Sequence, residues 1–212
     1  MFSYPYSVPL IWIIISFITC HIVSIYCMSS HKLRILFVSI LALFVLIIMF
    51  QFRYFSEEWK WYKLQRNTFS KELTYNIYKS LYKKLQNKPD FLYNYGAWLH
   101  HNGYYRESLI VLLECKNRYH DYNVEMLIAD DYRNIDAPNK AIEHFRFANQ
   151  MVPCRFLPLY HEMLIWENTG DSANARFVAK KILEKPAKKT KEPTTIKIKN
   201  EAKSLLYKYK LP

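Results

Sequence analysis

The sequence predicts an all-α protein in which two transmembrane helices precede a TPR-like α-solenoid, a stack of helix-turn-helix repeats. Residues 1–52 are almost uncharged, and Lys32 and Arg34 are their only Lys or Arg residues. Of the net charge of +12, these two account for +2, which leaves +10 for the polar residues 53–212. In this second part, Ser108 lies 33 positions before Ala141, and Ala141 lies 34 positions before Ala175. The uncharged first part and the periodic second part therefore predict two different kinds of helical structure.

The two intervals between Ser108, Ala141 and Ala175 match the period of about 34 residues in tetratricopeptide (TPR) repeats. Each TPR repeat is a pair of antiparallel helices. We expect small residues where the two helices of a pair cross, with Gly96 facing Ser108 and Ala129 facing Ala141. The third repeat departs most from the pattern, because Met163 stands where a small residue is usual. Large residues are expected between the repeats: Leu92, Leu99, Leu112, Ile128, Tyr132, Phe145, Leu159 and Trp166.

The turns inside the repeats also follow the pattern. Gly103 and Gly170 fall at the turns of the first and third repeats, where a left-handed backbone conformation is often needed. Asp136 takes this position in the second repeat, and a residue with a Cβ atom adopts that conformation less readily.

Residues 1–52 predict a transmembrane hairpin with spans at about 8–28 and 33–52. Each apolar run approaches the roughly 20 residues that cross a bilayer. A cleavable signal peptide is the alternative for the first run, but no basic residue precedes it and no small-residue cleavage pattern follows it. His21 lies within the first span, where it is either a functional group or a neutral side chain hydrogen-bonded to a neighbouring helix.

The remaining chain divides into three predicted segments. Residues 53–88 are expected to form interfacial and leading capping helices, with a break at 67–70 and a helix start at Ser70. Residues 89–188 hold the TPR-like repeats, and residues 189–212 form a Lys-rich C-terminal capping helix. The lysines suit a solvated outer face or contact with anionic lipid. Nucleic acid is not expected, since no recognition motif accompanies the charge.

The sequence shows no catalytic centre, and we predict no metal and no cofactor. The four cysteines form no CxxC or Cys/His spacing, the histidines form no HExxH motif, and Gly-rich phosphate loops are absent. Cys115 falls at a small buried position of a repeat, so we expect it to pack. We therefore assign the chain a binding function.

A TPR stack offers a concave groove that is lined by the first helix of each pair. Its mixed aromatic and charged lining suits a protein or peptide segment. An ordinary polar surface without a ligand is the alternative. The predicted partner-binding residues are Tyr93, His100, Met126, Asp130, Arg133, Tyr160 and Glu167, with Ala97 and Leu164 beside them.

The apolar hairpin is followed by the segments 91–97, 103–108, 126–130 and 195–201. In this combination the chain resembles the C-terminal part of O-antigen ligase-like membrane proteins of the Bacteroidetes. This resemblance implies an accessory role in cell-surface polysaccharide assembly at the bacterial inner membrane. The family's catalytic loop is missing from this chain, so no catalytic residue is assigned and enzyme activity stays open. The alternative is a stand-alone membrane-anchored TPR adaptor. Positive residues after the second span favour a cytoplasmic stack, whereas the resemblance implies a periplasmic one, and the sequence does not decide between them.

Overall fold

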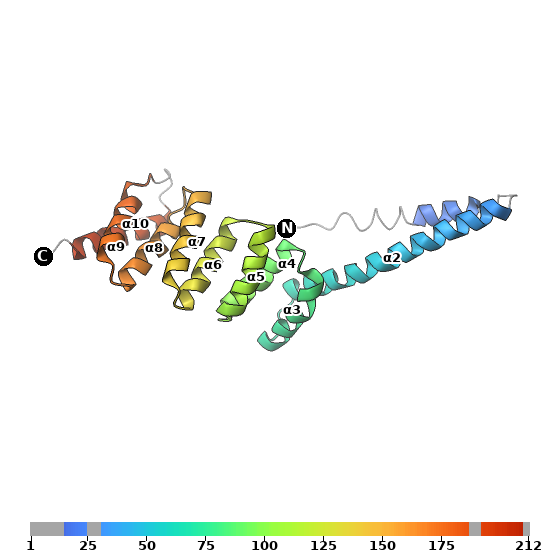
Figure 1. Cartoon of the computed structure of the whole chain (residues 1–212), viewed down its shortest axis with the longest axis horizontal. Helices are drawn as coiled ribbons and strands as arrows, with labels where there is room; N and C mark the ends of the chain where they lie inside the picture. Colours follow the sequence, from blue (N-terminus) through green and yellow to red (C-terminus); the bar gives the residue numbers. More distant parts are fainter. Residues whose placement is uncertain (1–14, 25–30, 187–191, 210–212) are drawn as a thin grey trace. The chain divides into compact units, whose positions relative to one another are not determined.

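The computed structural model describes residues 15–24, 31–186 and 192–209 (Figure 1). The chain divides into two units, Met1–Phe69 and Ser70–Pro212. We call the second unit the helical stack. All regular structure in the described residues is helical, as the sequence predicts.

In the first unit, residues 15–24 are helical and run beside the first part of α2 (His31–Arg66) (Figure 1). Phe17 contacts Phe44 of α2, with ring centroids 4.5 Å apart. Within its own helix, its ring centroid lies 4.2 Å from that of His21. Among the described residues, no helix combines the length and the apolar character that a bilayer crossing demands. The spans predicted at 8–28 and 33–52 therefore stay predictions, and residues 8–14 and 25–28 lie outside the described part.

The helix α2 continues past residue 52, where the sequence analysis expected a new helix to begin. Neither Gly nor Pro occurs between Ile35 and Arg66, so the sequence contains none of the residues that usually end a helix. The expected break follows at 67–70. There Ser70 caps α3 (Lys71–Leu85), its hydroxyl accepting a hydrogen bond from the Leu73 amide at 3.3 Å.

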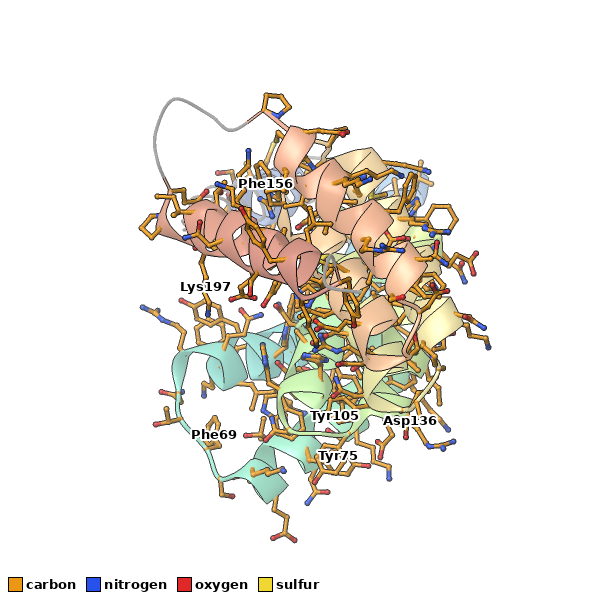
Figure 2. All side chains as sticks on the ribbon, turned by 90° about the vertical axis from the view of Figure 1, so that its left-hand side faces the viewer. Phe69, Tyr75, Tyr105, Asp136, Phe156 and Lys197 are labelled. Atoms are coloured by element: carbon orange, nitrogen blue, oxygen red, sulfur yellow. The ribbon has the colours of Figure 1, made fainter. Side chains whose placement is uncertain are left out.

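The helical stack contains three helix pairs in chain order. They are α4 (Pro89–His101) with α5 (Tyr105–Arg118), α6 (Tyr122–Asn134) with α7 (Pro138–Met151), and α8 (Leu157–Asn168) with α9 (Ser172–Glu184). The leading helix α3 packs on α4, and α10 (Pro193–Lys208) packs on α9 and α8. Viewed from the C-terminal end of the stack, α9 and α10 lie nearest the viewer (Figure 2). The predicted TPR-like solenoid is confirmed.

The close helix crossing in the first pair explains its glycine. A Cβ atom on Gly96 would lie only 2.5 Å from Cδ2 of Leu112, closer than real Cβ contacts come. Ser108, opposite, is fully buried and donates its hydroxyl hydrogen bond to the Gly96 carbonyl at 3.0 Å. Ala129 and Ala141 are fully buried together in the second pair. The predicted facing pairs are therefore confirmed.

The turns inside the three repeats share one geometry. Gly103, Asp136 and Gly170 all have positive φ, of 83°, 58° and 79°. In each turn the next residue's amide donates to a carbonyl five residues back, for example Tyr104 to Leu99 at 2.9 Å. This pattern is the Schellman motif that ends many helices. Asp136 is the only non-Gly residue with positive φ in the described part of the chain, so the strain expected there is present.

The last helix, α10, has the burial pattern of the first helix of a fourth repeat. Its buried residues Ile198, Ala202 and Leu205 follow steps of four and three. The same steps separate Val124, Ile128 and Asp131 in α6, and they separate Pro158, Glu162 and Ile165 in α8. In both cases this face packs on the preceding repeat. By this alignment α10 is a first helix, and no second helix follows it in the described residues.

We predict that Asp136→Gly stabilises the stack, because glycine adopts φ of about 60° without the Cβ penalty. The expected gain is about 1 kcal/mol, seen as a higher Tm in circular dichroism of the full chain in detergent. Gly103→Ala is the matched control of opposite sign and should lower the Tm. A lower Tm for Asp136→Gly would show that its side chain stabilises the turn by more than its strain costs.

Candidate functional site

The predicted groove residues lie on the first helices α4, α6 and α8, and all are partly accessible. They occupy equivalent places in successive repeats. Tyr93, Met126 and Tyr160 form one row, and His100, Arg133 and Glu167 form another. The structure thus positions them on three helices as the repeat alignment predicts. Their role in partner binding stays a prediction.

Several of these residues contact one another in a charged chain across three helices. His100 on α4 lies with Nε2 3.5 Å from Oδ2 of Asp130 on α6. Arg133 is paired with Asp130 at 2.5 Å and, on its other side, its Nη1 contacts Nδ1 of His161 on α8 at 3.1 Å. These contacts join the first helices of the three repeats. The middle of the groove is therefore polar and already internally paired.

The pKa values of two histidines in this set of charged contacts are shifted by their surroundings. The hydrogen bond to Asp131 raises the pKa of His100, with burial acting in the opposite direction. Burial lowers the pKa of His161, and the neighbouring positive charge of Arg133 adds to this effect. His161 also stacks on Phe145, with centroids 5.1 Å apart. A neutral His161 can accept the hydrogen bond that Arg133 donates.

The helix α10 contacts the residues at the C-terminal end of the predicted groove. The hydroxyl of Tyr160 donates to the Glu201 carboxylate at 2.5 Å, and Nζ of Lys208 contacts Glu167 at 2.9 Å. Leu164 packs against the hydrophobic cluster that α8, α9 and α10 share. These contacts with the capping helix were not predicted from the sequence. They hold α10 in place in the structure.

In the part of the chain that the structure describes, the N-terminal end of the groove is formed by residues that α10 does not contact in any hydrogen bond or ion pair. Tyr93 and Ala97 on α4 and Met126 on α6 are each partly exposed, and they take no part in the contacts of the charged chain. Met126 touches the small cluster around Phe145 from the side. Burial raises the pKa of Tyr93, and the charge of Asp121 contributes in the same direction. An aromatic ring on α4 and a flexible thioether on α6, at equivalent places in successive repeats, suit an apolar side chain of a partner.

Within the stack, three buried carboxylates were not predicted from the sequence: Glu125, Asp131 and Glu162. Each lies on a first helix, and each is paired with a base from the preceding repeat. Asp131 contacts Nδ1 of His100 at 2.7 Å, and Arg146 reaches Glu162 at 2.7 Å. The only indication of their burial in the sequence is their position in the repeat, where apolar residues are usual. An acid at such a position requires a partner from a neighbouring helix.

Glu125 has the most extensive set of partners. Its fully buried carboxylate contacts Nζ of Lys116 at 2.8 Å and Nδ1 of His144 at 2.5 Å, and it also contacts His120. Burial acts to raise the pKa of this carboxyl, but the hydrogen bonds from His144, Lys116 and His120 outweigh it and lower the pKa to about 2. Glu125 therefore fastens α6 to α5 and α7.

The described side chains contain no cluster of three or more His, Cys, Asp or Glu residues placed to hold a metal ion. Cys115 is fully buried, and burial raises the pKa of its thiol to about 11. Its sulfur contacts the Pro89 carbonyl at 3.4 Å. A buried, protonated thiol is unreactive, so the predicted packing role of Cys115 is confirmed.

Comparison with known proteins identifies no family. No protein-family model matches the chain, and no curated protein matches it. Among solved structures, the chain is similar to one described as MamA MSR-1 C2, with 11% identity and a TM-score of 0.49. That alignment covers 66% of this chain and 69% of the other. It is also similar to a Pseudomonas aeruginosa PilF structure, with 14% identity and a TM-score of 0.48, covering 64% of this chain and 61% of the other. The assignment to the TPR fold rests on this chain's own spacing, turns and helix pairs.

We predict that Glu125→Gln lowers the stability of the stack, because the bases around it lose their charged partner; the cost is about 3 kcal/mol. The pKa of Glu125 in the folded protein lies below its ordinary value of 4.5, so the charge stabilises the fold fully above about pH 4.5. That contribution is lost as the pH falls from about 4.5 toward 2. The Tm difference between wild type and variant should therefore shrink over this range.

The exposed residue Glu143 provides a matched control for this measurement. Glu143→Gln removes one carboxylate without touching the buried pairs, and its Tm should stay close to that of the wild type. A Glu125→Gln difference that does not change between pH 6 and pH 3 would contradict the assigned role of the charge.

Proposed function

We propose that the protein is a membrane-anchored TPR adaptor of the bacterial inner membrane, whose stack binds a segment of a protein partner. The observation that carries the proposal is the alignment of three first helices with an accessible aromatic and thioether surface at Tyr93, Ala97 and Met126. This surface borders the charged chain around Asp130 and Arg133. A partner segment with an apolar anchor and polar flanks matches that lining.

The membrane anchor is proposed from the first unit. Large aliphatic side chains stand exposed along α2, with Leu46 at 63% and Met49 at 64%. The hydroxyls of Thr19, Ser24 and Ser39 all donate to carbonyls of their own helices, at 2.7–3.0 Å. Side chains satisfied in this way need no water, which suits a hydrocarbon environment. The uncharged sequence over 8–28 and 33–52 supports the same proposal.

We predict that Tyr93→Ala/Met126→Ala abolishes capture of the partner while leaving the stack folded. Arg133 and Tyr160 are kept, because they bind His161 and Glu201 within the stack and their removal would confuse binding with stability. The measurement is affinity purification of the full chain from detergent-solubilised membranes with quantitative mass spectrometry.

The control for this purification is Ile110→Ala/Tyr119→Ala, which removes two exposed apolar side chains outside the predicted groove. It should recover the same partner as the wild type. Equal loss with both variants, or no loss with the groove variant, would remove the groove as the binding site.

A second candidate is the accessory C-terminal portion of an O-antigen ligase-like protein of cell-surface polysaccharide assembly. The segments 91–97 and 103–108, which follow an apolar hairpin, favour it. A neighbouring upstream reading frame that encodes about ten apolar spans would support it, since the family's catalytic loop lies among such spans. Both candidates are compatible with contact between the Lys-rich C-terminal end and anionic lipid.

The two candidates predict opposite sides for the stack, and Cys154 can distinguish them because it is exposed whereas Cys115 is buried. We use the full chain with Cys20 and Cys27 replaced by Ser and treat spheroplasts with a membrane-impermeant maleimide. The adaptor predicts labelling of Cys154 only after permeabilisation, as the positive charges after the second span favour. The accessory role predicts labelling in intact spheroplasts. Cys154→Ser gives the background, and Cys115 should react only after denaturation.

A further inference from the structure

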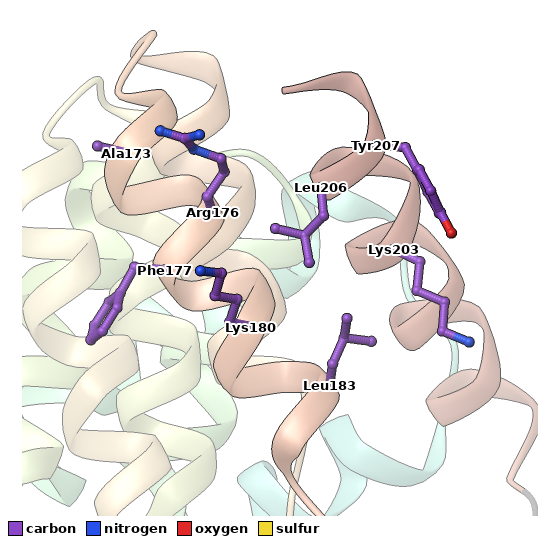
Figure 3. Close-up of a pocket in the computed structure, with 8 residues that line it drawn as sticks. All are labelled: Ala173, Arg176, Phe177, Lys180, Leu183, Lys203, Leu206 and Tyr207. Atoms are coloured by element: carbon purple, nitrogen blue, oxygen red, sulfur yellow. The ribbon is translucent and has the colours of Figure 1, made fainter. Parts of the chain in front are cut away.

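The C-terminal end of the stack contains a cavity of about 660 Å³ between α9 and α10 (Figure 3). Leu183 of α9 and Leu206 of α10 point into the space between the two helices, and the cationic groups of Lys180 and Lys203 lie on either side of it in this view (Figure 3). All of these residues belong to the stack. The cavity is therefore formed by one folded unit.

The α10 wall of the cavity is the face that a second helix covers in the earlier repeats. Lys203 and Leu206 follow the buried Ala202 at the same distances as Ala129 and Tyr132 follow Ile128. Ala129 packs with Ala141 of α7, the second helix of its pair. In the described residues, no helix covers the corresponding face of α10. The cavity thus occupies the place that the second helix takes in the earlier repeats.

The α9 wall shows the same departure from the earlier repeats. Arg176 directly follows the buried Ala175, whereas the residues that follow Ser108 and Ala141 are Leu109 and Ile142. Both of these apolar residues are buried. A cation stands at the equivalent place in the last repeat and lines the cavity.

The cavity combines free positive charge with exposed aromatic surface. Within the described part of the chain, Arg176, Lys180 and Lys203 form no ion pair or hydrogen bond. Some cations of the stack outside the cavity, such as Arg133 and Arg146, are paired, whereas these three unpaired cations line one site. The side chains of Phe177 and Tyr207, which also line the cavity, are 56% and 71% exposed. A polar cap would explain the cations but not these two rings.

We propose that this cavity is a docking site for an acidic amphipathic helix of a partner protein, which completes the fourth repeat. Its apolar stripe packs on Leu183 and Leu206, and its carboxylates pair with Lys180, Lys203 and Arg176. A second copy of this chain is a poor occupant, because the chain carries 30 Lys and Arg against 18 Asp and Glu. A lipid surface fits less well than a helix, since the site is a concave space between two helices. The site lies outside the groove of the proposed function.

The test uses the full chain in phosphatidylcholine nanodiscs and a fluorescein-labelled peptide of 14 residues, the length of α5 and α7. The peptide carries Leu at helical spacing on one face, Ala at the crossing position and Glu elsewhere. One control peptide has the same composition with the leucines scattered, and a second has Lys in place of Glu. Binding is measured by fluorescence anisotropy.

The charge variant is Lys180→Glu/Lys203→Glu, and Lys83→Glu/Arg106→Glu is the control with the same change in net charge at exposed sites away from the cavity. We expect the acidic peptide to bind the wild type, to bind the charge variant about tenfold more weakly, and to bind the control variant within about twofold of wild type. The Lys peptide should prefer the charge variant. This exchange of preference also shows that the variant is folded.

Three results would overturn the proposal. Equal binding of the scattered peptide, or equal weakening by both double variants, would indicate unspecific attraction between opposite charges. Loss of co-sedimentation with phosphatidylserine vesicles in the charge variant, with unchanged peptide affinity, would identify a lipid surface. Self-association of the wild type that the charge variant alone abolishes would identify a second copy as the occupant.

Discussion

Each first helix of a repeat has to bury two faces, one against its own second helix and one against the preceding repeat. The distance between the paired helices is set by what stands at their crossing. Gly96 leaves no room for even a Cβ atom beside Leu112, and Ala129 and Ala141 are fully buried at the next crossing. Side chains this small bring two backbones close, so the large residues beside them can interdigitate at interior density. The rest of the stack depends on this close approach.

The face of each first helix that packs against the preceding repeat carries the buried ion pairs of the stack. Glu125, Asp131 and Glu162 are buried acids on first helices, and each contacts a base of the preceding repeat: Lys116, His100 and Arg146 respectively. Removing one member of a buried pair leaves an uncompensated charge, which costs more than the pair contributes. Any shift of one repeat past its neighbour would separate the partners at that interface. Packing therefore supplies the attraction between repeats, and the buried pairs restrict them to one alignment.

The sequence was sufficient to predict what recurs at a fixed spacing. The intervals between Ser108, Ala141 and Ala175 predicted the pairs, and the turns at Gly103, Asp136 and Gly170 follow from the local need for positive φ. Partners that come from different repeats could not be predicted in this way. Nothing in the local sequence indicates that Glu125 meets both His120 and His144, or that Tyr160 meets Glu201 forty-one positions later.

The same limit applies to the candidate groove. Its residues were placed on the correct helices because the repeat alignment fixes which side of a first helix faces inward. Their accessibility was not predictable, since α10 reaches back to Tyr160 and Glu167. The long, uninterrupted α2 shows a related difference. Composition changes at residue 53, but a helix ends only where its backbone bonding is interrupted, and that happens after Arg66.

The two ends of the stack are closed in different ways. At the N-terminal end, α3 covers α4 with aromatic rings, and Tyr78 stacks on Tyr95 at 4.9 Å with an interplanar angle of 12°. At the C-terminal end, α10 buries only the face directed at the preceding repeat. An end cap needs a polar outer surface, and exposed lysines such as Lys197 satisfy this need. Solubility alone gives no reason to leave Phe177 and Tyr207 exposed beside three unpaired cations. An aromatic surface with one sign of charge is the arrangement that favours a specific partner of the opposite charge.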